Sequence, residues 1–354
     1  MYIALFDLMS ETLLATLMGL LGGLVLGLAA RLSQFCTLGT IEDAIYGQNF
    51  DRARMWGLAI GTSILLVHIA ISLNWVILQE SYYLRVPFNP LFTLIGGLLF
   101  GVGMAFAGTC GFGALARLGG GDLRSFVIVL VMGVTAYTVA SGPFSEAVSW
   151  MKQETAYQVR TGSISSHLSL LSGLPIPTIG GFIGSAILVI SFWRKSFWSD
   201  KKSIFWAIAV GIAISGGWIS THLIAQTGFS GLTPLSYSFT APIGSTILFL
   251  MTSSGTSPSF GVGSVCGVWS GALVGSLMKG HFKLEACEDP RELQRQIVGA
   301  MLMGVGAILA YGCSLGQGLS AMALLSFNAP IALISIICGA RLGLNYLITG
   351  RAFA

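Results

Sequence analysis

The chain has 354 residues, of which 54% are hydrophobic and only 9% are charged, and its formal net charge is +4. Soluble proteins carry about 25% charged residues, so a chain with so few cannot cover a water-facing surface. The same figures exclude intrinsic disorder and argue against binding to nucleic acid, because the basic residues form no continuous face. A mean hydropathy of +0.81 indicates a polytopic membrane protein.

Apolar runs along the chain predict nine membrane crossings. A helix needs about 20 apolar residues to cross a hydrocarbon core of ~30 Å. Several runs are short and lead into Gly- and Ser-rich stretches, which predict re-entrant half-helices covered by protein. We therefore expect an all-α polytopic membrane protein that forms one integral-membrane domain over 1–354. The runs cover 11–30, 55–78, 91–107, 125–141, 177–192, 204–222, 243–278 (interrupted), 296–311 and 329–349.

The first run and the basic residues together predict an orientation. The leading segment MYIALFDLMSET lacks the positive region of a secretory signal, so the first run is expected to stay as a membrane anchor. With the N-terminus outside, only Arg85, Lys152 and Arg160 of the 18 Lys and Arg residues fall on the outer side. Basic residues favour the cytoplasmic side. We therefore expect the N-terminus outside and the C-terminus inside.

An internal repeat relates two distant parts of the chain. Residues 94–116 read LIGGLLFGVGMAFAGTCGFGALA, and residues 297–319 read IVGAMLMGVGAILAYGCSLGQGL. A shift of 203 positions gives seven identities without a gap, including four glycines and the pair of Cys110 with Cys313. Because glycine patterns recur by chance in membrane helices, the matched cysteines are the most informative pair.

The predicted crossings place the two copies in opposite directions. The helix before the first copy's cysteine is expected to run inward, and the helix before the second copy's cysteine to run outward. We therefore predict inverted repeats of about 11–141 and 204–349, with a linking helix at about 177–192. Inverted repeats are typical of secondary transporters, whose sites lie near the midplane between the copies. The alternative is a pair of packing units with no site between them.

Three of the six cysteines share a local setting. Cys36 lies in QFCTLGT, Cys110 in GTCGFGA and Cys313 in YGCSLGQG, each after an apolar run and before small residues that could open a short helix. The chain has no CxxC pair and no Cys/His spacing of a zinc site, so we expect free thiols and no metal. The other thiols are expected to serve packing, since a buried free cysteine behaves as a small hydrophobe. They are Cys266, Cys287 and Cys338.

A half-helix that begins beside a thiol would suit a sulfur-containing anion. Its first N–H groups are unpaired and its dipole is positive there, which makes an anion site without a buried cation. The thiol adds a soft, polarisable donor. We expect further donors around the three cysteines, with helix packing as the alternative role for these small residues. The expected donors are Thr37, Gly39, Gly111, Gly113, Ser314, Gly316 and Gln317.

Other motifs restrict the class of function. No Walker A, Rossmann or hydrolase motif occurs in a credible context, so we expect no cofactor and no ATP-driven pumping by this chain alone. A thiol enzyme that forms a persulfide would need an activated thiolate, and no activating constellation is visible. Arg117 and Arg124 flank LGGGD and either draw anions at the inner mouth or act as positive-inside anchors, the role that we favour.

The cysteine motifs also carry a family resemblance. GTCGFGALARLGGGDLRS resembles the signature of the YeeE/YedE family of sulfur-compound membrane transporters, and the resemblance extends over essentially the whole chain. The stretches that carry it are 34–39 (QFCTLG), 108–125, 250–272 (LMTSSGTSPSFGVGSVCGVWSGA), 288–304 (EDPRELQRQIVGAMLMG) and 312–320 (GCSLGQGLS).

The resemblance implies uptake of thiosulfate across the bacterial inner membrane by an hourglass-shaped bundle with inverted halves. It also implies that Cys36, Cys110 and Cys313 line the central path and pass the anion along through S–H···S hydrogen bonds. Relatives are linked to other sulfur or selenium species and to sulfur-responsive signalling, so a membrane sensor and a transporter of another species remain alternatives. A cytoplasmic partner, either a small sulfur carrier of the TusA type or a transcriptional regulator, is consistent with the family.

Overall fold

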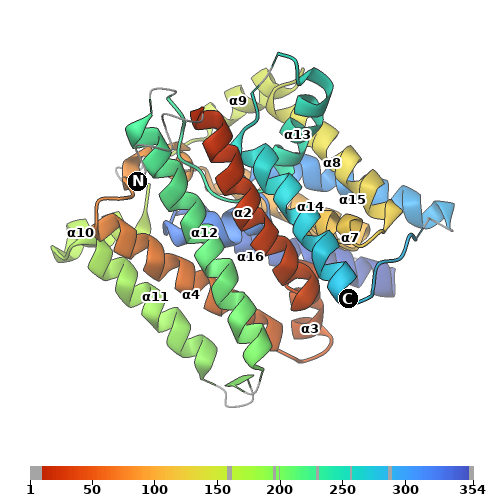
Figure 1. Ribbon diagram of the computed structural model, residues 1–354, viewed down its shortest axis with the longest axis horizontal. Helices are drawn as coiled ribbons and strands as arrows, with labels where there is room; N and C mark the ends of the chain where they lie inside the picture. Colours follow the sequence, from red (N-terminus) through yellow and green to blue (C-terminus); the bar gives the residue numbers. More distant parts are fainter. Residues whose placement is uncertain are drawn as a thin grey trace.

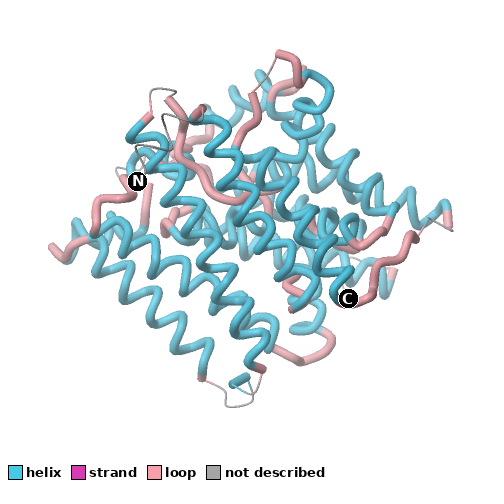
Figure 2. The backbone as a smooth tube through the Cα atoms, viewed as in Figure 1, coloured by secondary structure: helices cyan, strands magenta, loops and turns pink. Residues whose placement is uncertain are grey.

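The computed structural model describes residues 10–157, 162–193, 197–198, 200–228, 231–255, 257–285 and 289–350. These residues form helices and loops without a strand (Figure 2). Seven helical segments are long and apolar enough to cross a membrane, and eight if the bent pair α10 and α11 counts as one span. The expected class, an all-α polytopic membrane protein, is confirmed.

Each of the nine predicted runs is helical, but fewer than nine meet the length and composition of a span. The interrupted run splits into a short helix, α13, and a full one, α14. The run at 296–311 lies in α15, which begins with the polar sequence PRELQRQ and, taken over its whole length, is not among the seven long apolar segments. The helices are α2 (Glu11–Leu32), α4 (Asp51–Ser72), α6 (Pro90–Ala107), α8 (Leu123–Ala140), α11 (Ile176–Phe192), α12 (Lys201–Thr227), α13 (Thr240–Thr252), α14 (Phe260–Met278), α15 (Pro290–Leu309) and α16 (Asn328–Thr349).

Short helices follow the cysteine motifs. The α3 helix (Thr37–Ile45) continues α2, and α7 (Gly111–Gly119) continues α6, so that each pair forms one broken span. After Cys313 a short helix contains the π-helical segment η3 (Gly316–Ala321). Elsewhere, α10 (Ile164–Ser172) meets α11 at a bend of 117°. Smaller helices, α5 (Tyr82–Arg85) and α9 (Ser145–Glu154), lie between the spans.

Glycines bring the helices into backbone contact. The α2 and α14 helices lie side by side (Figure 1), and a methyl group added at Gly19, Gly23 or Gly27 of α2 would collide with the α14 backbone. Close approach of this kind is the usual means of packing helices in lipid, where the hydrophobic effect does not drive their association. The α4 helix packs in the same bundle between α11 and α12 (Figure 1).

The α6 and α15 helices meet through a reciprocal pair of glycine contacts. Gly96 lies against Gly306, and Gly103 lies against Gly299. A Cβ atom at any of the four would stand 2.6–2.7 Å from the carbonyl oxygen of its partner. The residue numbers fall on α15 as they rise on α6, so the two helices run antiparallel.

Candidate functional site

Two of the three motif cysteines cap the helices that follow them. The sulfur of Cys110 accepts a hydrogen bond from the Gly113 N–H at 3.4 Å, and the sulfur of Cys313 accepts one from the Gly316 N–H at 3.3 Å. Both side chains are almost fully buried, at 1% and 2% exposure. Each sulfur therefore lies at a helix start, where N–H groups would otherwise lack partners.

Cys36 lies at the start of α3 and close to the second cysteine motif. Cys36 is the N-cap residue of α3, although its side chain forms no cap hydrogen bond. Thr37, the residue after Cys36, has its hydroxyl oxygen 3.9 Å from the sulfur of Cys110, and neither cysteine is in a disulfide. The fold thus brings the first two motifs together.

Hydroxyl groups connect the thiols into one polar cluster. Thr37 donates a hydrogen bond to the hydroxyl of Ser314 at 3.1 Å, and its oxygen lies 3.9 Å from the sulfur of Cys110. On the other side, the hydroxyl of Ser238 lies 3.8 Å from the sulfur of Cys313. We call the cluster of these five side chains and Cys36 the waist, because cavities open on both sides of it.

Two cavities approach the waist from opposite directions. The first, which we call the Cys36 pocket, has a volume of about 400 Å³ and includes Cys36, Gly39 and Gly113 in its wall. The second, which we call the vestibule, has a volume of about 660 Å³ and ends at residues that touch Cys313 or its helix. Neither cavity includes Cys110 or Cys313 in its wall, so the two cavities do not join at these thiols. Polar side chains of the vestibule include Tyr82, Tyr83, Lys152, Ser238, Thr240 and Tyr311.

Lys152 supplies positive charge to the vestibule. Its ammonium group donates to the carbonyl oxygen of Ile308 at 2.6 Å and lies 3.8 Å from the centre of the Tyr311 ring. This position above an aromatic face favours the cation. Burial lowers the pKa of the lysine to about 8, because the charged form loses contact with water.

The glycine three positions after each cysteine lies directly against a polar side chain. A Cβ atom at Gly316 would stand 2.7 Å from the Tyr83 hydroxyl and 2.8 Å from that of Ser238. Added at Gly113 or Gly39, it would collide with a threonine hydroxyl or an arginine side chain. In this structure, these three positions fit only glycine without rearrangement of a polar neighbour.

The remaining expected donors have different surroundings. Gly111 packs against Met132, where a Cβ atom would lie 2.8 Å from the terminal methyl group. The amide of Gln317 donates to the carbonyl of Ala310 at 2.8 Å and so holds the turn that leads into Cys313. Its carbonyl oxygen is buried and has no hydrogen-bond partner among the described residues.

Thr240 is a candidate that the sequence reasoning missed. It begins α13, its side chain is buried, and its hydroxyl in the vestibule wall has no hydrogen-bond partner among the described residues. The shift of 203 positions aligns Thr37 with Thr240 and Cys36 with Phe239, which precedes α13 as Cys36 precedes α3. Extending the repeat to the first motif would have identified it.

The other cysteines lie away from the waist or outside the described residues. Cys266 and Cys338 are exposed, and neither lines the vestibule or the Cys36 pocket. Cys287 falls outside the described residues. The waist therefore gathers the three cysteines that share a sequence setting.

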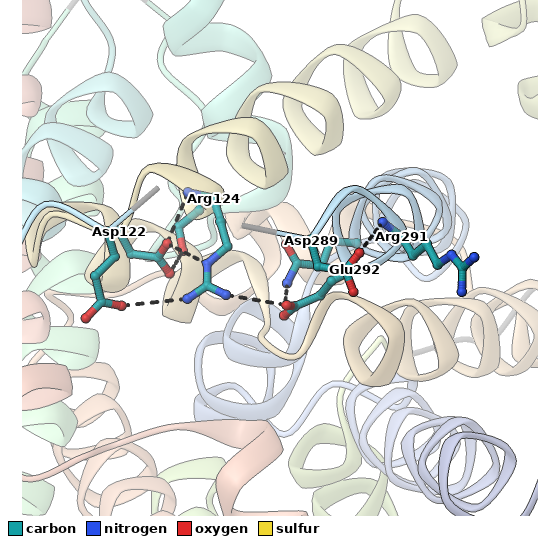
Figure 3. A network of polar contacts seen from close by, with 8 residues as sticks. Asp122, Arg124, Asp289, Arg291 and Glu292 are labelled. Carbon is teal, nitrogen blue, oxygen red and sulfur yellow. Dashed lines mark hydrogen bonds and ion pairs between the residues drawn. The ribbon is translucent and has the colours of Figure 1, made fainter. Parts of the chain in front are cut away.

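The two arginines that flank LGGGD have different environments. Arg124 lies 3.4 Å from Asp122, 3.6 Å from Glu285 and 3.5 Å from Glu292. Figure 3 shows its guanidinium group between Asp122 and Glu292. Arg117, in contrast, lines the Cys36 pocket. Only Arg124 is thus neutralised by surrounding carboxylates.

Comparisons with known proteins give a consistent result. The profile of a family described as sulphur transport matches residues 32–342. The thiosulfate transporter TsuA of Spirochaeta thermophila is 28% identical over 352 residues, which cover 91% of this chain and 96% of the relative. The thiosulfate transporter TsuA of Escherichia coli is 25% identical over 347 residues, with 91% and 92% covered.

Proposed function

Because this chain belongs to the YeeE/YedE family of sulphur transport proteins, we propose that it carries thiosulfate, or a closely related sulfur anion, through the waist. Membership of this family means that the chain is a membrane protein that transports a sulfur compound and is not an enzyme. The observation that supports the finer proposal is the position of the three free thiols, which stand at three helix starts between two cavities.

The chemistry of the waist suits both ends of thiosulfate. The anion has three oxygens, which accept hydrogen bonds from N–H and O–H groups, and a terminal sulfur, which accepts from a thiol. The Thr37, Ser238 and Ser314 hydroxyls lie beside the thiols and can serve the oxygens. A neutral thiol donates to the terminal sulfur, whereas a thiolate would repel the dianion. We therefore propose that the three thiols act in the protonated form.

The order of the thiols gives a sequence of stations. An anion in the vestibule would meet Cys313 first, then Cys110, and then Cys36, which opens into the second cavity. Movement along such a path requires each station to bind weakly enough to release the anion. Three similar stations in series meet this requirement better than one tight pocket.

We propose that the two halves, about 11–141 and 204–349, are inverted repeats linked by α11. The reciprocal glycine contacts support this, because Gly96 and Gly299 are repeat partners, as are Gly103 and Gly306, and each touches the partner of the other. The packing pairs support it as well: α2 packs on α14 as α12 packs on α4, and α6 packs on α16 as α15 packs on α8.

We further propose that the chain lies in the bacterial inner membrane with its N-terminus outside, the vestibule outside and the Cys36 pocket inside. Basic residues near the pocket, including Arg31, Arg52, Arg117 and Lys279, support this orientation. Arg160 of the earlier charge count lies outside the described residues. A cytoplasmic sulfur carrier of the TusA type would then collect the anion at the pocket.

Uptake into proteoliposomes that contain only this protein tests the proposal. We expect uptake of labelled thiosulfate that an equal concentration of external sulfate does not suppress, because sulfate lacks the terminal sulfur. A variant with Cys110→Ala and Cys313→Ala, recovered in the same amount and as a monodisperse protein, serves as the control and should show none. Absence of uptake by the well-folded wild-type protein would refute the proposal and favour a sensor.

A further inference from the structure

The wall of the Cys36 pocket contains several charged side chains, most of them basic. Its wall includes four basic side chains, those of Arg31, Arg52, Arg117 and Lys279, and one acidic side chain, that of Glu42. They come from α2, α3, α4, α7 and the residue after α14, so the tertiary fold brings them together. The side chain of Cys36 lines the same cavity.

Two of the cations are anchored at the edge of the pocket. The Nε of Arg31 donates to the hydroxyl of Ser276 at 2.6 Å, and the end of its guanidinium group lies over Gly120, where no side chain intervenes. Lys279 donates to the carbonyl oxygens of Arg31 and Leu32, at 2.6 Å and 3.2 Å, and closes the end of α2. These bonds fix both groups in place, and each retains further N–H donors.

Arg52 is engaged by neighbouring side chains. Its Nε lies 3.1 Å from a carboxylate oxygen of Asp43, and it donates a second bond to Gln34 at 2.6 Å. Arg52 and Asp43 neutralise each other, so we leave this arginine out of the charge that a ligand would meet.

Arg117 remains as a cation without a carboxylate partner in the described part of the chain. It extends from α7, whose N-cap is Cys110, and lines the same cavity as Cys36, Glu42 and Arg31. Arg124, the other arginine of the same motif, has three carboxylates around it (Figure 3). Arg31, Arg117 and Lys279, set against Glu42, leave a surplus of two positive charges around the cavity.

We propose that the Cys36 pocket is a binding site for a divalent tetrahedral oxyanion, held through its oxygens by Arg31, Arg117 and Lys279. Its place as the last station of the path rests on the proposed transport function. The waist would distinguish anions by the terminal sulfur, whereas guanidinium and ammonium groups bind oxygens regardless of it. Sulfate would therefore occupy this pocket from its open side although it does not pass the waist.

Protection of Cys36 from alkylation tests the site without measuring transport. The starting protein carries Cys266→Ala, Cys287→Ala and Cys338→Ala, so that Cys36 is the accessible thiol and the buried Cys110 and Cys313 remain. We would measure the rate of modification by a maleimide in detergent, identify the modified residue by mass spectrometry, and titrate with sodium sulfate. Sodium chloride at equal ionic strength controls for screening.

Sulfate is expected to slow the modification of Cys36 in a saturable way, and chloride is not. In Arg117→Gln the sulfate concentration for half protection should rise about tenfold, which corresponds to the loss of about 1.4 kcal/mol, as for one charge-assisted hydrogen bond. Arg117→Lys should recover most of the protection. Arg291→Gln, which changes an exposed cation at the start of α15 and outside the pocket, should behave as the parent protein.

Equal protection by sulfate and chloride would overturn the proposal, as would unchanged protection in both Arg117→Gln and Arg31→Gln. These outcomes are distinguishable from failure of the transport function. Sulfate protection in a protein that shows no thiosulfate uptake would leave the site intact and remove the transport proposal. Thiosulfate uptake by a protein whose Cys36 no anion protects from alkylation would leave the transport proposal intact and remove the proposed oxyanion site.

Discussion

Thr37 and Ser314 share a hydrogen bond of 3.1 Å although 277 positions separate them in the sequence. Each residue directly follows a motif cysteine, and the oxygen of Thr37 also lies 3.9 Å from the sulfur of the remaining motif cysteine, Cys110. The bond therefore joins the first and last cysteine motifs at the waist. An anion that takes the proposed path would have to replace this contact between the motifs with contacts to itself.

Removing a thiol at the waist should abolish transport. We expect Cys110→Ala and Cys313→Ala each to lose thiosulfate uptake while they still insert into the membrane, because each deletes one S–H donor from the series. Uptake into proteoliposomes measures this. Cys338→Ala, which changes an exposed thiol on the bundle surface, is the matched control and should keep normal uptake. Normal uptake in either waist variant would reduce these thiols to packing residues.

Cys36→Ser separates polarity from sulfur chemistry. The hydroxyl is smaller and less polarisable than the thiol, so it should bind the terminal sulfur of thiosulfate less well. We expect uptake to be partly or wholly lost at the same level of protein in the membrane. Full activity in this variant would mean that the station needs a polar group and has no preference for sulfur.

The space beside Cys313 should be sensitive to a single methyl group. In Gly316→Ala the added Cβ atom would stand 2.7 Å from the Tyr83 hydroxyl and displace it or Ser238. Overpacking of this kind costs about 1–3 kcal/mol, so uptake should fall about fivefold or more. Gly216→Ala on α12 is the control, because no atom lies within 4 Å of its added Cβ. An equal loss of uptake in Gly316→Ala and Gly216→Ala would contradict the expectation.

Uptake should depend on pH through Lys152. Burial lowers the pKa of this lysine to about 8, so the vestibule loses this cation as the pH rises through that value. Burial raises the pKa of the phenols of Tyr82, Tyr83 and Tyr311, so they stay neutral. The thiosulfate concentration for half-maximal uptake should therefore rise between about pH 7 and pH 9.

Two variants isolate the contribution of that lysine. Lys152→Arg should remove the pH dependence, because a guanidinium group stays charged over this range. Lys152→Gln should bind weakly at both pH values. A pH dependence that persists unchanged in Lys152→Gln would assign it to another group.

The proposed orientation can be tested with single cysteines at exposed positions. Ser141→Cys follows α8 and should lie outside, whereas Lys202→Cys begins α12 and should lie inside. In spheroplasts of cells that produce the protein with its surface cysteines removed, a membrane-impermeant maleimide should label the first and not the second. Lysis should then expose both. The reverse pattern before lysis would invert the predicted topology.

Hydropathy was sufficient to predict most of the fold, because a lipid environment leaves few alternatives to apolar helices. It also predicted the apolar run of α15, although Arg291, Glu292 and Arg295 in the same helix make the whole helix more polar than the other spans. The breaks after α2 and α6 could be placed from the cysteine motifs. The glycine contacts between α6 and α15 could not be placed, because a sequence does not say which glycine-rich helices meet.

The sequence predicted the cysteines of the candidate site but not the residues around them. Cys36, Cys110 and Cys313 could be grouped by their shared setting, and the structure places them around one waist. Ser238 precedes α13 in a stretch without helical periodicity, and Lys152 looked like an isolated outer charge. Both belong to the site only through tertiary packing, which positions them beside Cys313 and Tyr311.

The repeat is unequal at one position beside the path. A shift of 203 places Phe239 where the first half has Cys36, while Thr37 and Thr240 remain the same residue type. Two identical halves facing opposite ways would make the two mouths chemically equivalent. Phe239 is fully buried against Phe112 and does not line the vestibule, whereas Cys36 lines the pocket on the other side of the waist. The proposed path would therefore have a thiol at one end without a counterpart at the other, and an anion would meet different partners according to the side from which it enters.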